Sequence, residues 1–92
     1  MDFEWDVAKE KSNLRKHRIA FEDAVQIFDA PILEGPDPRD FGEERIIALG
    51  EANGTVLLVV YTWRKTKRRI ISARKATKQE REIYYREVFG NI

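Results

Sequence analysis

The side chains that could carry chemistry in this 92-residue chain are mainly basic, and they gather in its last third. Residues 61–92 hold 10 Lys and Arg against 3 Asp and Glu, a net charge of +7. Residues 1–60 hold 7 Lys and Arg against 13 Asp and Glu, a net charge of −6. The overall charge of +1 therefore conceals a division along the chain, and a cationic region on an acidic protein favours a polyanionic partner, most often a nucleic acid.

Aromatic residues flank the basic region, with Tyr61 and Trp63 at its start and Tyr84 and Tyr85 near its end. Arg can hold a phosphate through its planar fork, and Lys binds it as a point charge. Basic surfaces beside aromatic rings suit single-stranded RNA, whose bases unstack and pack on the rings. Basic faces also keep proteins in solution, so the pattern leaves that structural role open.

Two further side chains are candidates for proton transfer. Histidine is the side chain best suited to that task near neutral pH, and His17 is the only one in the chain. His17 also falls near the end of an expected helix, where a cation is favoured for structural reasons. Glu80 is a possible general base, but its position three residues after Thr77 fits a capping box equally well.

Several classes of chemistry lack the residues they need. With no Cys, the chain has no disulfide framework, thiolate zinc site or Cys nucleophile. It contains no P-loop, no GxGxxG or GxSxG motif and no His pair at metal spacing, so we expect no metal and no cofactor. A chain this short buries only about 60–65% of its unfolded surface, which predicts a shallow site. The acidic N-terminus and the lack of a long apolar run predict a cytoplasmic protein.

We expect one domain over residues 1–92, with two helices before a sheet and one after it. Asp6 is a good N-cap for a first helix over residues 7–17. A second helix, ending before Pro31, has an apolar face formed by Phe21, Ala24, Val25 and Phe28. The last helix opens at the Thr77 capping box and runs to about residue 89.

Three β-rich runs predict an antiparallel meander: residues 44–50, 55–63 and 68–75. Asn53-Gly54 is a strong hairpin signal between the first two, and the second is apolar on both faces, which places it in the sheet centre. Residues 3–5 fit a short strand or an extended lead-in, and residues 34–40 predict an exposed loop. The expected fold class is α+β, an antiparallel sheet with helices packed on it.

Alternation along the third run separates its basic residues into two faces. Ile71 and Ala73 form the natural pair facing the core. Ser72 and Arg74 then lie on the more open face, about 7 Å apart. This rigid strand is expected to present the cations that hold a phosphate.

At this point the chain resembles the BrnT family of type II toxins over nearly its whole length. The resemblance rests on Phe3-Glu4-Trp5-Asp6, Lys16-His17, Phe21-Glu22-Asp23-Ala24, Ile70-Ile71-Ser72-Ala73-Arg74-Lys75, Glu80-Arg81 and Tyr84. It implies a RelE-like fold and a ribonuclease that arrests translation without a metal. The mechanism that we expect is attack of the RNA 2′-hydroxyl on the adjacent phosphate. It also implies a BrnA-like ribbon-helix-helix antitoxin that forms a 2:2 heterotetramer with the toxin. Within this complex only the antitoxin would contact operator DNA.

The residues and the resemblance together give ten candidate site residues. The candidates for catalysis are His17, Arg64, Arg74, Glu80 and Tyr84. The candidates for binding RNA are Lys16, Lys65, Arg68, Lys75 and Arg81. Two departures from the family pattern concern the geometry near His17: Arg18 stands where Gly is usual, and Ala20 replaces the usual Ser cap.

Two other functions fit the same charges. The chain could be a module without catalysis, an inactive toxin homologue whose basic face only docks a partner protein. Direct DNA binding is a second alternative, although no helix-turn-helix spacing or basic recognition helix is present.

Overall fold

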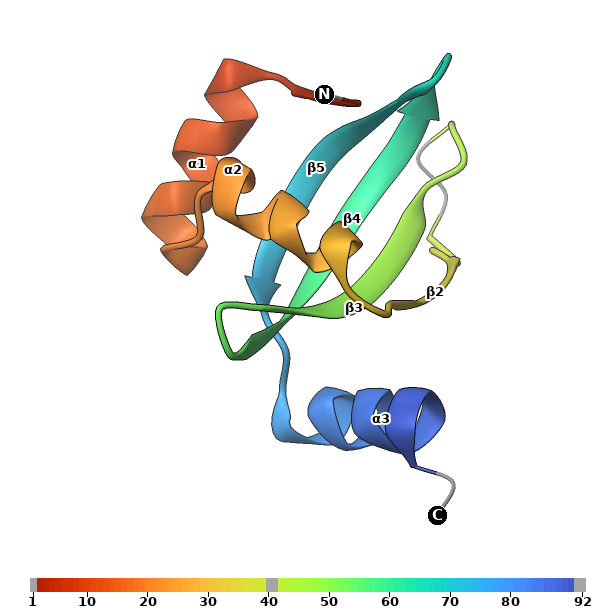
Figure 1. The fold of residues 1–92 in the computed structure, drawn as a ribbon. Coiled ribbons are helices and arrows are strands. Elements are labelled where there is room, and N and C mark those ends of the chain that lie inside the picture. The colour runs from red at the N-terminus through yellow and green to blue at the C-terminus, as the bar shows by residue number, and fades with distance from the viewer. Residues whose placement is uncertain (1, 40–41, 91–92) are drawn as a thin grey trace.

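The computed structural model describes residues 2–39 and 42–90 (Figure 1). The order of its elements is β1 (Phe3–Trp5), α1 (Val7–His17), α2 (Phe21–Ala24), the 3₁₀ helix η1 (Val25–Asp29), β2 (Leu33–Pro36), β3 (Ile46–Ala52), β4 (Thr55–Arg64), β5 (Lys67–Lys75) and α3 (Lys78–Phe89). This confirms the predicted α+β class. Within these two ranges no helix has the length and hydropathy required to cross a bilayer.

The five strands form one sheet in the order β1-β5-β4-β3-β2. Strands β2 to β5 pair antiparallel, which confirms the meander, and β1 runs parallel to β5, so residues 3–5 are a strand. The central position of β4 explains why both of its faces are apolar. Asn53 and Gly54 turn the β3–β4 hairpin with φ angles of 52° and 81°, as this tight turn requires.

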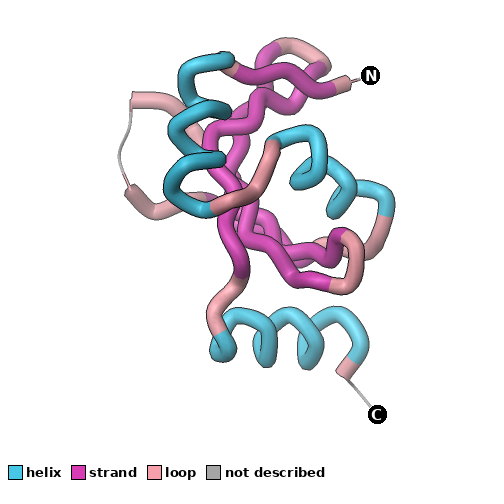
Figure 2. The backbone as a smooth tube through the Cα atoms, turned by 90° about the vertical axis from the view of Figure 1, so that its left-hand side faces the viewer, coloured by secondary structure: helices cyan, strands magenta, loops and turns pink. Residues whose placement is uncertain are grey.

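The helices lie on different sides of the sheet (Figure 2). Helices α2 and η1 pack on one face, where Phe21, Ile27, Tyr61 and Ile70 are fully buried. Helix α1 and the segment after β2 lie toward the opposite side. Helix α3 lies at one end of the sheet, where Tyr84 joins a second buried cluster.

The first predicted helix is confirmed, but the second winds differently. Helix α1 begins after Asp6, whose carboxylate accepts a hydrogen bond from the Ala8 N–H at 2.8 Å. The second helix is α-helical only from Phe21 to Ala24 and continues as a 3₁₀ helix. A 3₁₀ helix has three residues per turn, so the buried residues are spaced three apart. They are Phe21, Ala24 and Ile27, which differ from the predicted set. Val25 and Phe28 are only half-buried.

The predicted faces of the third run need a correction at Ile71. Residues Val60 and Ser72 pair across β4 and β5, but the next pair is Tyr61 with Ile70, so Ile71 is an extra residue in a β-bulge. The bulge shifts the alternation, and Ile70 and Ala73 are the fully buried residues of this strand. Ile71 is half-buried on the other side.

The exposed loop predicted for residues 34–40 is also wrong in part. Leu33–Pro36 form strand β2 on the outer edge of β3, with Gly35 opposite Ile47. Gly and Pro are tolerated there because an edge strand needs only one of its sides for pairing. Asp37 is buried, and Asp40 lies outside the described residues.

Candidate active site

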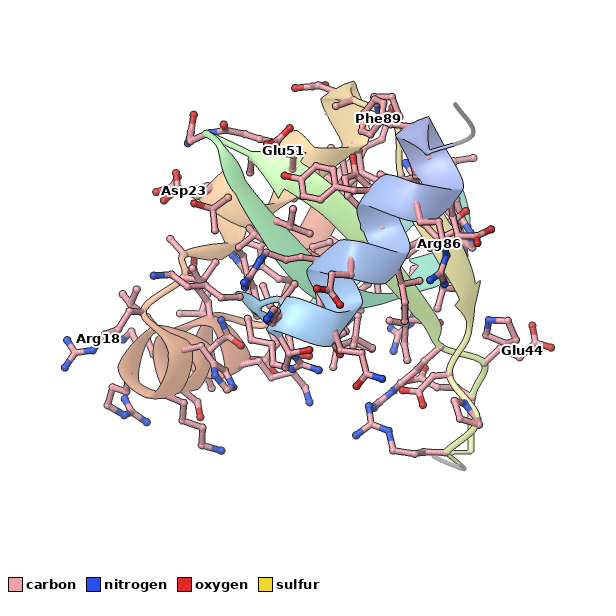
Figure 3. All side chains as sticks on the ribbon, turned by 90° about the horizontal axis from the view of Figure 1, so that it is seen from below. Arg18, Asp23, Glu44, Glu51, Arg86 and Phe89 are labelled. Carbon is pink, nitrogen blue, oxygen red and sulfur yellow. The ribbon has the colours of Figure 1, made fainter. Side chains whose placement is uncertain are left out.

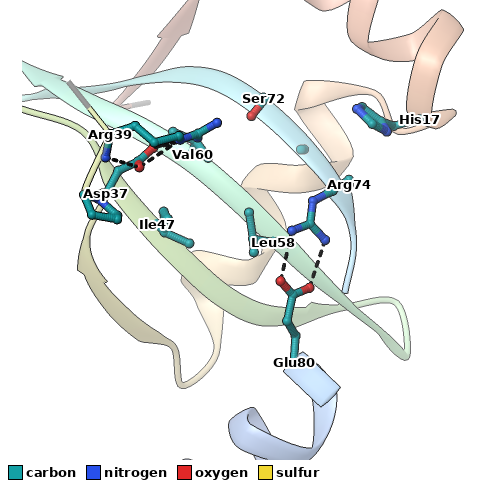
Figure 4. A pocket seen from close by; sticks show the side chains of 11 residues that line it. His17, Asp37, Arg39, Ile47, Leu58, Val60, Ser72, Arg74 and Glu80 are labelled. Atoms are coloured by element: carbon teal, nitrogen blue, oxygen red, sulfur yellow. Dashed lines mark hydrogen bonds and ion pairs between the residues drawn. The ribbon is translucent and has the colours of Figure 1, made fainter. Parts of the chain in front are cut away.

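A groove of about 450 Å³ crosses the sheet face opposite α2 and η1 (Figure 4). Side chains of three neighbouring strands form its floor: Ile47, Leu58, Val60 and Ser72. These residues alternate with Ala48, Leu57, Val59 and Ala73 of the core cluster under α2, which places them on the other face. Polar side chains surround this mainly apolar floor in three groups, which form the charged walls of the groove.

His17 forms one wall, and a buried amide one turn earlier in α1 fixes its position. The Asn13 side chain donates to the Ala73 carbonyl at 2.9 Å and accepts from the Ala73 N–H at 3.0 Å. Asn13 therefore occupies the edge of β5 that β1 is too short to cover. Helix α1 ends directly after His17, because Arg18 adopts the left-handed conformation (φ 61°) expected from its replacement of Gly. This ending leaves His17 on the lining of the groove, to which Ser72 and Arg74 also belong.

Arg74 and Glu80 form the second wall. The Arg74 Nη1 and Nη2 atoms donate to the two Glu80 carboxylate oxygens at 2.8 and 2.9 Å. Glu80 also accepts from the Thr77 N–H at 2.9 Å, while its own N–H donates to the Thr77 hydroxyl, completing the predicted capping box of α3. Glu80 thus combines a structural role with contact to the groove. The bonds from Arg74 lower the pKa of the Glu80 carboxyl, and the same bonds raise the pKa of the Arg74 guanidinium.

The third wall, Asp37 and Arg39, was missed by the sequence analysis. The Arg39 Nη2 atom donates to one Asp37 carboxylate oxygen at 2.7 Å, and its Nε donates to the other at 3.0 Å. The Arg39 N–H donates to the same carboxylate at 3.1 Å. These bonds, the side-chain bond first, lower the pKa of Asp37. The Asp-x-Arg spacing of an Asx-turn was the available signal, but it lay in a segment rich in ordinary turn residues.

Lys16, Arg81 and Tyr84 lie near the groove or beneath its end, but none of them lines it. Lys16 borders a smaller hollow of about 200 Å³ that shares His17 and Ser72 with the groove. Arg81 donates to the Ala76 carbonyl at 3.2 Å. Tyr84 has no exposed surface, and its hydroxyl donates to the Pro31 carbonyl at 2.7 Å. The structure therefore places Tyr84 in the core, where contact with a substrate is blocked.

The remaining candidates lie elsewhere on the molecule. Arg64 and Lys65 are at the tip of the β4–β5 hairpin, six residues along β4 from Leu58, which pairs with Arg74. Six strand residues span about 20 Å, so this tip is too far away to share the groove. Arg68 lies over the Phe28 ring at 4.3 Å, on the face covered by η1. Lys75 borders a third hollow together with Arg18 and Asp23. Figure 3 labels Arg18 and Asp23 on the same side of the molecule.

The groove thus unites a potential proton acceptor with groups that bind phosphate. His17 can exchange a proton, and the guanidinium groups of Arg39 and Arg74 can bind anionic oxygens. The described residues hold no group of three His, Cys, Asp or Glu side chains placed to bind a metal ion. The side chains that line the groove can supply acid–base and electrostatic chemistry.

Comparison with known proteins gives the family. No curated protein sequence matches the chain significantly. The sequence model of one family, described as the ribonuclease toxin BrnT of type II toxin-antitoxin systems, matches residues 5–80. This range contains every element from α1 to β5 and the start of α3, including all three walls of the groove. A match over most of the chain, together with the fold and the groove, shows that it belongs to the BrnT family of ribonuclease toxins.

Proposed function

We propose that the chain is a metal-independent endoribonuclease that cleaves single-stranded RNA in the groove and so inhibits translation. The observation that carries the proposal is that His17 and Arg74, which come from elements at opposite ends of the chain, line the same groove. The reaction is attack of a ribose 2′-oxygen on the adjacent phosphorus. The products are a 2′,3′-cyclic phosphate and a 5′-hydroxyl.

His17 is the proposed general base. Its imidazole accepts the proton of the 2′-hydroxyl as the 2′-oxygen bonds to phosphorus, and the bond from phosphorus to the 5′-oxygen breaks. The leaving 5′-oxygen takes a proton from water, which the open groove admits. Glu80 is a weaker candidate for the base, because both of its oxygens are bonded to Arg74 and its pKa is lowered.

Arg74 is the proposed group that stabilises the charge of the transition state. Negative charge builds up on the phosphate oxygens during the attack, and a guanidinium already fixed in place needs no reorientation to meet it. The two bonds from Arg74 to Glu80 supply that fixation. Glu80 is thus a positioning residue, and Lys16 is placed to contact RNA that extends past His17.

An antitoxin partner follows from the family, and its form is part of the proposal. We infer a BrnA-like ribbon-helix-helix protein that covers the groove in a 2:2 complex in the cytoplasm. Such an antitoxin would contact operator DNA itself. Acidic side chains are the groups expected to occupy the walls formed by Arg39 and Arg74.

The proposal predicts a defined cleavage chemistry that depends on His17. The purified chain should cleave single-stranded RNA to products ending in a 2′,3′-cyclic phosphate, and it should leave an oligonucleotide with a 2′-deoxyribose at the scissile position intact. His17→Ala should lower the cleavage rate by about 10²- to 10⁴-fold, because proton transfer in the transition state is lost. The measurement is single-turnover cleavage of end-labelled RNA.

Arg15→Ala is the matched control, because Arg15 is exposed on α1 and does not line the groove. It should cleave as the wild type does. Intact RNA with the wild-type chain, and no growth arrest when the chain is expressed without the neighbouring reading frame, would favour the alternative of a docking module without catalysis.

A further inference from the structure

The pair Asp37–Arg39 is built in a way that ordinary surface ion pairs are not. The Asp37 side chain has no exposed surface, whereas the Arg39 side chain that it holds is 64% exposed. Burying a carboxylate is costly unless hydrogen bonds replace its water, and here Arg39 supplies the side-chain and backbone donors. A buried anion therefore fixes the direction of an exposed cation.

Arg39 is directed into the groove. In Figure 4 its side chain reaches across the floor from the β2 side toward Ser72, whereas Arg74 approaches from the β5 side. The pKa of Arg74 is raised chiefly by its hydrogen bonds to Glu80, while the positive charge of Arg39 acts in the opposite direction. Arg39 and Arg74 line the same groove and repel each other, and anions bound in the groove would reduce this repulsion.

Both cations already have a carboxylate partner, so the groove does not need a counterion to be stable. Because the two guanidinium groups lie on different walls of the groove, each can hold a phosphate of its own. A chain with successive phosphates can contact both walls at once, as the backbone of single-stranded RNA does. The arrangement of two fixed guanidinium groups on opposite walls matches a ligand with repeated negative charges.

We propose that Arg39 binds a second phosphate of the RNA, next to the scissile one held at Arg74, and that Asp37 is the residue that positions Arg39. This inference rests on the proposed ribonuclease function and assigns a substrate length to it. The groove recognises at least two consecutive phosphates. A substrate with only the scissile phosphate lacks the contact to Arg39.

Substrates of different length test this proposal. The set is a dinucleoside monophosphate and two trinucleotides, each with one ribose 2′-hydroxyl and with the extra phosphate on either the 5′ or the 3′ side. The wild type should cleave at least one trinucleotide about 10- to 100-fold more efficiently than the dinucleotide, measured as kcat/KM. Arg39→Ala should remove that gain, so that this variant cleaves the trinucleotide and the dinucleotide with similar kcat/KM.

Asp37→Asn supplies a second measurement. It keeps the shape of the side chain but weakens the hold on Arg39, so it should raise KM for the trinucleotide with little change in kcat. Arg86→Ala is the matched control. Like Arg39, Arg86 is an exposed arginine (65%) beside a carboxylate, that of Glu87. It lies on α3 (Figure 3) and does not line the groove. Thermal unfolding of all three variants checks that they fold.

Binding of an uncleavable 2′-deoxy oligonucleotide gives a readout independent of catalysis. The slope of log affinity against log salt concentration should fall by about 0.7 in Arg39→Ala, the value for one phosphate contact on a single strand. If Arg39→Ala keeps the gain from the extra phosphate, or lowers the dinucleotide rate equally, the second phosphate position is refuted while the ribonuclease stands. If the wild type cleaves none of the substrates, the proposed function itself fails.

Discussion

The two ends of β5 carry basic side chains in contrasting ways. At the groove end, Arg74 is 38% exposed and two hydrogen bonds of 2.8 and 2.9 Å fix it to Glu80. At the hairpin end, Lys65 and Lys67 are exposed, and Arg64 has a carboxylate oxygen of Glu43 only at 4.0 Å. The hairpin end has more charge, but the groove end has charge in a fixed direction.

This difference shows which cations suit catalysis and which suit attraction. A fixed guanidinium stabilises a transition state because no reorganisation is needed when charge develops. Solvated cations at a hairpin tip attract RNA over a longer range, and salt screens that attraction. Arg68 is a third type, since its guanidinium lies over Phe28 at 4.3 Å and Trp63 at 4.7 Å and so contributes to packing.

The largest expected effect separates Arg74 from Arg68. Arg74→Ala should lower the rate of RNA cleavage by about 10²- to 10³-fold, as loss of a fixed donor to the transition state does. Arg68→Met, which keeps an unbranched apolar stem but lacks the guanidinium, should cleave as the wild type does but lower the free energy of unfolding by about 1–2 kcal/mol through lost cation–π contacts. Single-turnover cleavage and urea unfolding measure the two quantities. Equal cleavage by the two variants would remove the distinction between the ends of β5.

A smaller effect tests how Glu80 ties α3 to the groove. Because the bonds from Arg74 lower the pKa of Glu80 below its ordinary 4.5, the ionised carboxylate stabilises the folded state above about pH 4.5, and this stabilisation is lost as the pH falls through the lowered pKa. Glu80→Gln should cost about 1 kcal/mol of unfolding free energy at pH 7 through the weakened cap and ion pair. The difference from the wild type should shrink as the pH falls below about 4.5.

Urea unfolding at a series of pH values measures this difference. The lowered pKa of Asp37 gives the wild type and the variant the same additional loss of stability in acid, so the comparison isolates Glu80. A gap between the two proteins that stays constant down to pH 3 would contradict the link.

The smallest effect on chemistry is expected at the hairpin tip. The triple change Arg64→Ala, Lys65→Ala and Lys67→Ala should reduce the salt slope of RNA binding by up to about 2, since each contact to a single strand contributes about 0.7. KM should rise and kcat should stay at the wild-type value, because the tip is about 20 Å from Arg74 along the strands. A loss of kcat comparable to that of Arg74→Ala would move the reacting phosphate to the hairpin.

The parts of the fold that local signals specify were predictable. Asp6 begins α1, Asn53-Gly54 turns the β3–β4 hairpin, and the capping box of Thr77 and Glu80 begins α3. Each signal acts within a few residues. Strand β2 and the bulge at Ile71 depend on pairing with strands far along the chain, so neither periodicity nor turn composition revealed them.

The site was predictable to the extent that its side chains come from regular elements. His17 at a helix end, with Arg74 and Glu80 on either side of a cap, could be placed from their spacing. Arg64 and Lys65 precede β5 in sequence, but an antiparallel hairpin carries its tip away from the end where β5 meets α3. The family match covers Arg64, Lys65 and Arg74 but does not give the distances between them. Those distances follow from the register of β4 on β5.

The edges of the sheet limit how copies of the unbound chain can associate by strand addition. The two outer strands have three and four residues, and Pro36 gives β2 one residue without an N–H donor. On β5, where β1 stops, the Asn13 amide occupies the N–H and carbonyl of Ala73. A second copy of the chain therefore finds little free backbone for strand addition, which protects the unbound toxin against aggregation edge to edge.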